Sequence, residues 1–346
     1  DGPLVAYPSV LAHLDKIEAD LRAGKLLDFV ALEAYKAEVL KPGKQCRLIR
    51  HRGFDAQVVM RRYFGSFASY CNGSCGDGFL SVGMNMWGPD YDAWMTSNEE
   101  FSRSGTSFDF VNYDCIYNYQ FIGRAASNIN SFYKEFDSGW CADDDAIREA
   151  LLYSILHSKN TYGQGLYQAR YGGLTGNMLT LLLNGIIGHM LIAIAYIMLA
   201  RIHCPGQATL TAFRRNVKAT HEGDDCVMFT KPSIQGWFNG ENIATFFQGY
   251  AVHATPSDKS ASWKDHSVNA IDRLGYCSTL AVRNTFGIPA TRWLAVPERF
   301  GIGKSTKYIK RGLPVDVACK QNVHGNQLRM LGFGPEVYHD YYNESK

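Results

Sequence analysis

The spacing of apolar residues along the chain predicts helices that alternate with short strands. Leu11, Leu14, Ile17 and Leu21 recur at helical intervals on a charged background. Because residues three and four apart share one face of a helix, this pattern predicts a helix over residues 9–23. The same reasoning predicts further helices over 55–70, 142–158 and 178–200.

Strand patterns fall between these helices. Residues 46–51 predict a short basic strand, and residues 106–114 alternate like a strand before they reach a turn. Residues 218–229, "KATHEGDDCVMF", predict a hairpin that turns near Gly223. The mixed order of elements predicts an α+β fold, with an antiparallel sheet covered by helices on one face.

The most apolar segment, residues 178–200, has about the length of a helix that crosses a membrane. A single transmembrane anchor is one interpretation. Asn184 and His189 lie inside the segment, together with Gly185 and Gly188, and a lone membrane span gains nothing from them. A helix buried on all sides in a large enzyme can use them, so we expect a buried helix and no transmembrane segment.

Composition narrows the class of protein. The 346 residues leave room for two or three domains, or for one large enzyme with several subdomains. The content of 46% hydrophobic and 20% charged residues is typical of a globular chain. The net charge of +2 does not by itself indicate a nucleic-acid partner. Nine cysteines without a repeated spacing indicate free thiols in a reducing compartment. The chain begins at Asp1, as expected of a processed product or of a piece of a longer chain.

Two adjacent acids, Asp224 and Asp225, lie at the turn of the predicted hairpin. Neighbouring carboxylates that leave water repel each other unless a cation stabilises them. Ligands made only of oxygen favour Mg²⁺ or Mn²⁺. A solvated turn is the simpler interpretation of these residues taken alone, because glycine and aspartate are common in turns.

A second acidic segment, around Asp109, favours a metal site over a solvated turn. If Asp109 ends a strand beside the hairpin, it supplies a third carboxylate to the same site. Two metal ions held there can bind both the attacking and the leaving oxygen of an in-line phosphoryl transfer. Asp114 falls just past the strand, where it can accept a hydrogen bond instead.

Polar residues also interrupt the apolar helix. Thr175, Thr180 and Asn184 follow the pattern Thr-Gly-x-x-x-Thr-x-x-x-Asn. Thr180 and Asn184 are four apart and therefore lie on one helix face. Both need hydrogen-bond partners, and the simpler interpretation is that they bind backbone carbonyls.

Together these segments resemble motifs of the viral RNA-dependent RNA polymerases of the picornavirus-like group. "FDFVNYD", "GGLTGNMLTLLLN" and "EGDDCVMF" are similar to motifs A, B and C. "GKQCRLIRHRGFDAQVVMRRYFG" resembles motif F and the helix that follows it, and "ATPSDKSA" resembles motif D. The five motifs follow the family order F-A-B-C-D between residues 43 and 262.

The resemblance implies a right-hand polymerase with fingers, palm and thumb. It implies fingers over 1–105, palm motif A over 106–118, a fingers or palm insertion over 119–170, palm motifs B to E over 171–285 and a thumb over 286–346.

The resemblance also implies roles for the acids. Asp109, Asp224 and Asp225 match the ligands of two Mg²⁺ or Mn²⁺ ions in such enzymes. In such enzymes one ion activates an RNA 3′-hydroxyl, which attacks the α-phosphate of an incoming nucleotide, and the other ion neutralises the triphosphate. Lys259 matches the motif D lysine that is proposed to protonate the departing pyrophosphate.

Further matched positions handle the nucleotide and the template. Asp114, Thr180 and Asn184 match the residues that recognise the ribose 2′-hydroxyl, and Arg47 and Lys44 match those that hold the triphosphate. The flexible loop that adjusts to the template base matches Gly172, Gly173, Thr175 and Gly176.

The implied partners are an RNA template and primer, nucleoside triphosphates and other viral replication proteins, with a protein primer as a further candidate. The implied location is the host-cell cytoplasm, at membrane-associated replication complexes.

Rival classes are a metal-dependent nuclease or other phosphohydrolase, a non-enzymatic RNA-binding or capsid protein, and a membrane protein anchored by residues 178–200. A nuclease would share the carboxylates but has no need of Thr180 and Asn184 on one helix face.

Overall fold

The computed structural model of the chain describes residues 7–36, 43, 46–74, 78–168, 175–257, 263, 271, 274–284, 291–297, 314–330 and 333–344. Contacts within the chain divide it into two compact units. The first unit comprises residues 1–36, 47–73 and 112–187. The second comprises residues 37–46, 74–111 and 188–346.

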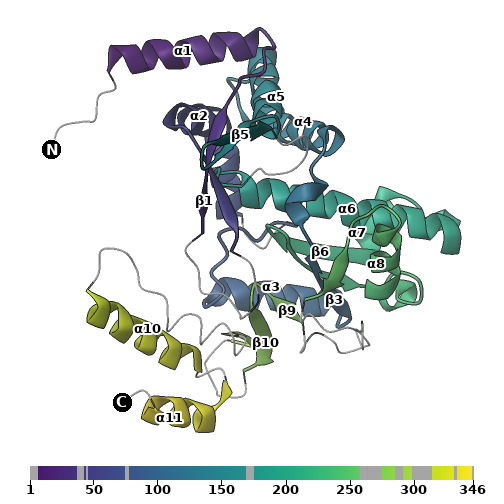
Figure 1. Ribbon diagram of the computed structural model, residues 1–346. Coiled ribbons are helices and arrows are strands. Elements are labelled where there is room, and N and C mark those ends of the chain that lie inside the picture. Colours follow the sequence, from purple (N-terminus) through teal and green to yellow (C-terminus); the bar gives the residue numbers. More distant parts are fainter. Residues whose placement is uncertain are drawn as a thin grey trace. The chain divides into compact units, whose positions relative to one another are not determined.

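The first unit contains a four-stranded sheet and several helices, among which α5 lies against both α1 and α4 (Figure 1). Its helices are α1 (Pro8–Arg22), α2 (Phe54–Gly73), η1 (Tyr113–Ile116), α4 (Tyr119–Phe136), α5 (Ala142–Leu156) and the beginning of α6 (Thr180–His203). Its strands are β1 (Val30–Tyr35), β2 (Leu48–Arg52), β4 (Lys159–Tyr162) and β5 (Gly165–Gln168).

The strand order in this sheet is β2-β1-β4-β5, and only the β1–β4 pair is parallel. The predicted basic strand is β2, and the predicted helices at 9–23, 55–70 and 142–158 are α1, α2 and α5. Asp143, Asp144 and Asp145 lie in the first turn of α5. Their negative charges interact favourably with the positive end of the helix dipole.

The second unit is built around a sheet that carries the acidic hairpin. The strands of this unit, which do not all belong to that sheet, are β3 (Gly105–Phe110), β6 (Val217–Glu222), β7 (Asp225–Thr230), β8 (Ala254–Pro256), β9 (Gly275–Tyr276), β10 (Thr279–Arg283) and β11 (Trp293–Pro297). Its helices are α3 (Pro89–Phe101), the remainder of α6, η2 (Pro205–Gln207), α7 (Leu210–Asn216), η3 (Pro232–Ile234), α8 (Gly240–Gln248), α10 (Val315–Met330) and α11 (Pro335–Glu344).

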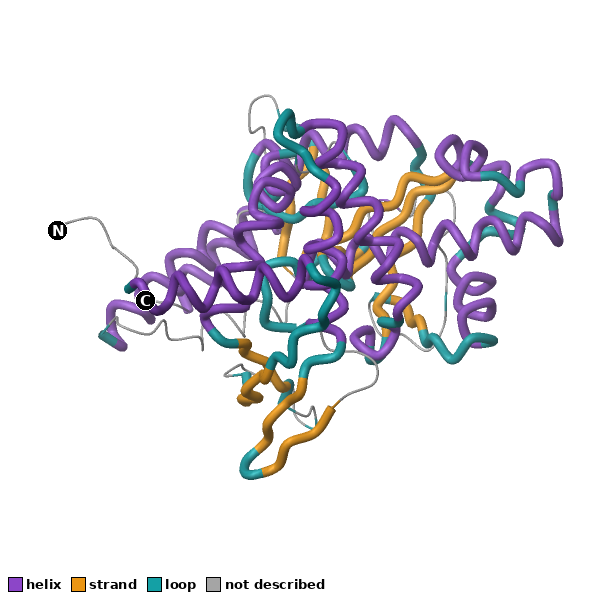
Figure 2. Tube along the Cα trace, turned by 90° about the horizontal axis from the view of Figure 1, so that it is seen from above, coloured by secondary structure: helices purple, strands orange, loops and turns teal. Residues whose placement is uncertain are grey.

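The main sheet of this unit has the order β6-β7-β3-β8, and every pair in it is antiparallel. Figure 2 shows its strands in orange among the helices. Val227 and Phe229 on one face of β7 belong to the apolar core that contains Trp94 of α3. On the opposite face, the His221 ring lies 5.7 Å from that of His189 of α6. Helices therefore pack on both faces of the sheet, whereas the sequence predicted helices on one face.

Helix α6 accounts for the apolar segment of the sequence. Among the described residues it is the one helix that is long and apolar enough to cross a membrane. In its most apolar 18-residue stretch, 61% of the residues are buried within the protein. Such burial is typical of a core helix, because apolar side chains that contact the rest of the protein are not available to lipid.

Candidate active site

The two adjacent acids lie at the tip of the β6–β7 hairpin. Glu222 pairs with Asp225 as the last residues of the ladder, so the connection consists of Gly223 and Asp224 alone. Gly223 adopts a φ of +67°. A two-residue hairpin turn needs a positive φ at its first central position, which glycine adopts without a steric penalty. This turn leaves Asp224 exposed at the tip, while Asp225 is half-buried at the start of β7.

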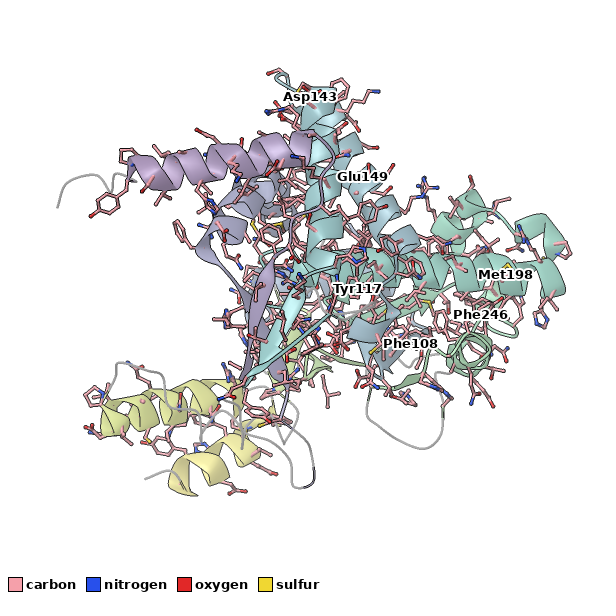
Figure 3. All side chains as sticks on the ribbon, turned by 45° about the horizontal axis from the view of Figure 1, so that its top comes forward. Phe108, Tyr117, Asp143, Glu149, Met198 and Phe246 are labelled. Carbon is pink, nitrogen blue, oxygen red and sulfur yellow. The ribbon has the colours of Figure 1, made fainter. Side chains whose placement is uncertain are left out.

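Asp109 lies on the strand next to this hairpin. It is the fifth residue of β3, and the β3–β7 register ends with Phe108 opposite Cys226. Asp109 is one residue after Phe108 on β3, and Asp225 is one residue before Cys226 on β7. Continued by one step, this antiparallel register therefore brings Asp109 to the level of Asp225. Figure 3 labels Phe108 on this strand, one residue before Asp109. The predicted strand beside the hairpin is therefore confirmed, and Asp109 stands on it next to β7.

The oxygen-only character of these side chains suits a hard divalent cation. Asp109 and Asp225 come from neighbouring strands, and Asp224 comes from the turn between strands. Within the described part of the chain, no three His, Cys, Asp or Glu side chains are grouped as a ready-made metal site. Mg²⁺ commonly binds through one or two carboxylates together with substrate phosphates, so the acids present fit such an ion. Their role as metal ligands stays a prediction.

A group of residues that carried no sequence signal supports the hairpin tip. The carboxylate of Glu222 accepts a hydrogen bond from the Cys277 thiol, with 3.6 Å between sulfur and oxygen. Burial raises the pKa of the Glu222 carboxyl. Behind it, the backbone amide of Ser81 donates to the His221 carbonyl at 3.0 Å, and the Ser81 and Tyr276 hydroxyls lie 2.5 Å apart. These contacts hold β6 from the side opposite β7.

In the first unit, strand β2 follows Arg47 directly. Arg47 is exposed, and its carbonyl accepts the backbone amide of Lys36 at 2.9 Å. Arg50, farther along β2, donates to the Glu33 carboxylate at 2.8 Å, and the Tyr167 hydroxyl also bonds this carboxylate. The basic strand is thus partly neutralised within the sheet, while Arg47 is exposed, and its role in holding the triphosphate stays a prediction.

The segment before α6 contacts β2 closely. Gly176 adopts a φ of +74°, and a Cβ on it would stand 1.9 Å from the Arg50 carbonyl oxygen. Arg52 is 6% exposed and donates to the Thr175 carbonyl at 3.1 Å. Burial and the nearby Arg50 lower the pKa of Arg52 to about 10, so its guanidinium remains charged at neutral pH. Two segments that resemble motifs F and B therefore meet in this unit.

For Thr180, at the start of α6, the simpler interpretation holds. The Thr180 hydroxyl donates to the Asn177 carbonyl at 2.9 Å, which is the backbone bond expected of an unremarkable threonine. The backbone carbonyl of Asn184 accepts the Tyr113 hydroxyl at 2.6 Å. Because Tyr113 and Asp114 share η1, this bond ties the short helix that carries Asp114 to α6. The structure thus brings the segments of Asp114 and Asn184 together, and their role in ribose recognition stays a prediction.

Four of the predicted site residues, Lys44, Gly172, Gly173 and Lys259, lie outside the described residues. Arg52 and Gln57 were missed by sequence reasoning, although both contact the loop before α6. Gln57 donates to the Gly176 carbonyl at 3.2 Å. Both lie within the segment that resembles motif F, but the resemblance assigned them no role, since their importance comes from contacts with a segment more than a hundred positions away.

Comparison with known proteins decides the family. The family model described as viral RNA-dependent RNA polymerase matches residues 19–344, which is nearly the whole chain. The chain belongs to the viral RNA-dependent RNA polymerase family. A solved structure, "Sicinivirus 3Dpol RNA dependent RNA polymerase", superposes with a TM-score of 0.77 at 17% identity and covers 99% of this chain and 66% of that one. The fold is therefore that of a right-hand polymerase, as predicted.

Curated relatives of this family member are polyproteins of RNA viruses. The replicase polyprotein of cricket paralysis virus is 28% identical over 193 residues, which is 54% of this chain and 11% of the polyprotein. The RNA1 polyprotein of tomato ringspot virus is 26% identical over 238 residues, or 67% of this chain and 10% of the polyprotein. The chain thus spans about a tenth of the length of these relatives.

Proposed function

We propose that this chain is an RNA-directed RNA polymerase, which extends an RNA 3′-end with nucleoside triphosphates on an RNA template. The family match over residues 19–344 carries this proposal. The acidic hairpin beside Asp109 supports it, because template-directed phosphoryl transfer needs oxygen ligands for divalent ions. A nuclease would share these acids, but it would not account for the family match or for the polymerase fold.

We assign the metal-binding role to Asp109, Asp224 and Asp225. Two Mg²⁺ or Mn²⁺ ions, when bound there, would polarise the attacking hydroxyl and neutralise the triphosphate. The hairpin contributes by fixing Asp224 on a two-residue turn and Asp225 at the first position of β7, where the backbone has little freedom. Strand β3 fixes Asp109 in the same way, since its carbonyl accepts the Thr255 hydroxyl at 3.2 Å.

The remaining residues bind and select the nucleotide in this proposal. Arg47 offers an exposed guanidinium whose fork suits phosphate oxygens. Asp114 and Asn184 lie on segments joined through Tyr113, and we assign them, with Thr180, to the ribose 2′-hydroxyl. A site built to hydrogen-bond a hydroxyl rejects a nucleotide that lacks it.

The same proposal assigns Lys44 to the triphosphate, Lys259 to protonation of pyrophosphate, and Gly172, Gly173, Thr175 and Gly176 to the template loop. Other replication proteins and a protein primer are proposed partners. We propose a location at membrane-associated replication complexes in the host cytoplasm, because the curated relatives include viral replicase polyproteins.

Primer extension on a homopolymer RNA template tests the activity. The purified chain is incubated with a labelled complementary RNA primer, the matching nucleoside triphosphate and either Mg²⁺ or Mn²⁺. We expect extension that requires the template and a divalent ion and that stops on addition of a chelator. Cleavage of the primer without extension would instead support the nuclease alternative.

A further inference from the structure

Arg52 lies at the end of β2 with its guanidinium enclosed by two other segments. One nitrogen, Nη1, donates to the Thr175 carbonyl at 3.1 Å. The other, Nη2, donates to the Ser158 hydroxyl at 3.2 Å and to the Ile155 carbonyl at 3.4 Å. The side chain therefore bridges the C-terminal end of α5 and the segment that leads into α6.

A second contact holds the same segment one residue further on. The Gln57 side-chain amide donates to the Gly176 carbonyl at 3.2 Å. Gly176 also packs so closely on Arg50 that a Cβ would lie 1.9 Å from its carbonyl oxygen. Two consecutive carbonyls, those of Thr175 and Gly176, are thus held by side chains on either side of Gly53. We call Arg52, Gln57 and their bonds to these two carbonyls the loop clamp.

Burial of the Arg52 guanidinium is unfavourable in free energy. Removing such a group from water costs several kcal/mol unless hydrogen bonds compensate. A neutral side chain of similar size would avoid that penalty, so packing alone does not explain an arginine at position 52. The planar fork of arginine, however, can bind separate acceptors on two segments at once in a fixed geometry, and a lysine ammonium holds geometry less well.

We propose that Arg52 is a positioning residue of the nucleotide site, and that the loop clamp fixes Thr175 and Gly176 relative to strand β2. This inference rests on the proposed polymerase function. Strand β2 begins immediately after Arg47, and α6 begins at Thr180, four residues beyond Gly176. The clamp thereby sets the spacing between the segment that holds the triphosphate and the segment that meets the ribose and the template.

Three variants of the full chain and one control test the clamp. Arg52→Lys keeps the charge but removes the fork, and Arg52→Met removes the charge. Gln57→Leu removes one bond to the loop and leaves Arg52 intact. The control, Ser158→Ala, removes a bond from the same guanidinium on its α5 side only.

Two measurements separate positioning from general stability. Amide hydrogen exchange over residues 175–183 reports the order of the loop without requiring catalysis. Steady-state primer extension gives kcat and KM for the nucleotide, and the ratio of ribonucleotide to deoxyribonucleotide incorporation. Thermal unfolding identifies any variant that has lost its fold.

We expect exchange over 175–183 to accelerate about tenfold in Arg52→Lys and Gln57→Leu, as the loss of one hydrogen bond worth about 1.4 kcal/mol implies. We expect KM for the nucleotide to rise, or ribonucleotide selectivity to fall, by at least about threefold in both variants, with the unfolding temperature of Gln57→Leu nearly unchanged. Ser158→Ala should stay within twofold of the wild type. If the Arg52 variants fail to fold, Gln57→Leu decides.

Two results would overturn the proposal. One is a folded Arg52→Lys or Gln57→Leu variant with wild-type exchange, KM and selectivity. The other is an equal defect in Ser158→Ala, which would indicate that Arg52 only supports α5. Failure of the proposed function is distinguishable, because then the wild-type chain extends no primer while hydrogen exchange still reports on the clamp.

Discussion

The carbonyl oxygen of Arg50 occupies the position where a side chain on Gly176 would stand, with 1.9 Å between that oxygen and an ideal Cβ. The two residues are 126 positions apart, yet only glycine permits this approach of one backbone to another. Gly176 also adopts a φ of +74°, which other residues rarely tolerate. The contact therefore restrains both the loop before α6 and the strand after Arg47.

Replacement of Gly176 by alanine should destabilise the protein more than the same change at Gly163. Gly163 has a similar φ of +59°, but nothing lies within 4 Å of its Cβ position. The backbone penalty of about 1 kcal/mol is then common to both variants. The clash at Gly176 should add about 1–3 kcal/mol. Urea unfolding of the two variants measures the difference, and equal losses would contradict the close contact.

Asp224→Ala should abolish nucleotide incorporation and leave the fold intact. The side chain is exposed at the hairpin tip, so the free energy of unfolding should change by no more than about 0.5 kcal/mol. Removal of a metal ligand should lower the rate by about two orders of magnitude or more. Primer extension and thermal unfolding check both statements. Glu241→Gln, an exposed acid in the first turn of α8, is the control, and normal incorporation by Asp224→Ala would refute the metal assignment.

Asp114→Ala should weaken the preference for ribonucleotides over deoxyribonucleotides. A hydrogen bond to a charged group is worth about 1.5–3 kcal/mol, which corresponds to a loss of selectivity of at least about tenfold. Competition between a ribonucleotide and its deoxy analogue in primer extension measures the ratio. Asp15→Ala, an exposed acid on α1, serves as the control. An unchanged ratio would remove the ribose role of Asp114.

Acid should weaken the protein through two histidines, the buried His221 and the half-buried His189. His189 stacks on Phe79 at 4.2 Å, and its ring lies 5.7 Å from that of His221. Burial lowers the pKa of His189 to about 4, and burial also lowers that of His221. In the unfolded chain these histidines therefore bind protons near pH 6.5, whereas in the folded chain they stay neutral at that pH. Stability from His189 is complete above about pH 6.5 and is lost as the pH falls toward about 4, by about 3 kcal/mol at most.

Urea unfolding at pH 7 and at pH 5 measures this loss. His189→Phe should keep the stacking on Phe79 and remove one titrating group, so its stability should depend less on pH. The residual dependence should come from His221 together with any acids that titrate in this range. Identical pH dependence in the variant and the wild type would show that His189 does not contribute.

Local patterns were sufficient for much of the fold. Gly223 between two strand-like segments predicted the β6–β7 hairpin, because a tight turn depends only on the few residues that form it. The helical spacing of Leu11, Leu14, Ile17 and Leu21 likewise predicted α1, in which the last three are buried and Leu11 is exposed. Elements of this kind are encoded by neighbours in the chain, and their side-chain period is readable without a partner.

The arrangement of distant segments depended on packing that no local pattern encodes. The sequence placed Asp109 on a strand, but only the pairing of β3 with β7 brings it to the level of Asp225. Arg52 lies one residue past the strand predicted over 46–51, and its burial against the Thr175 carbonyl arises because α5 and the loop before α6 enclose it. Local order follows from short-range sterics and hydrogen bonding, whereas these contacts form only when several elements share one core.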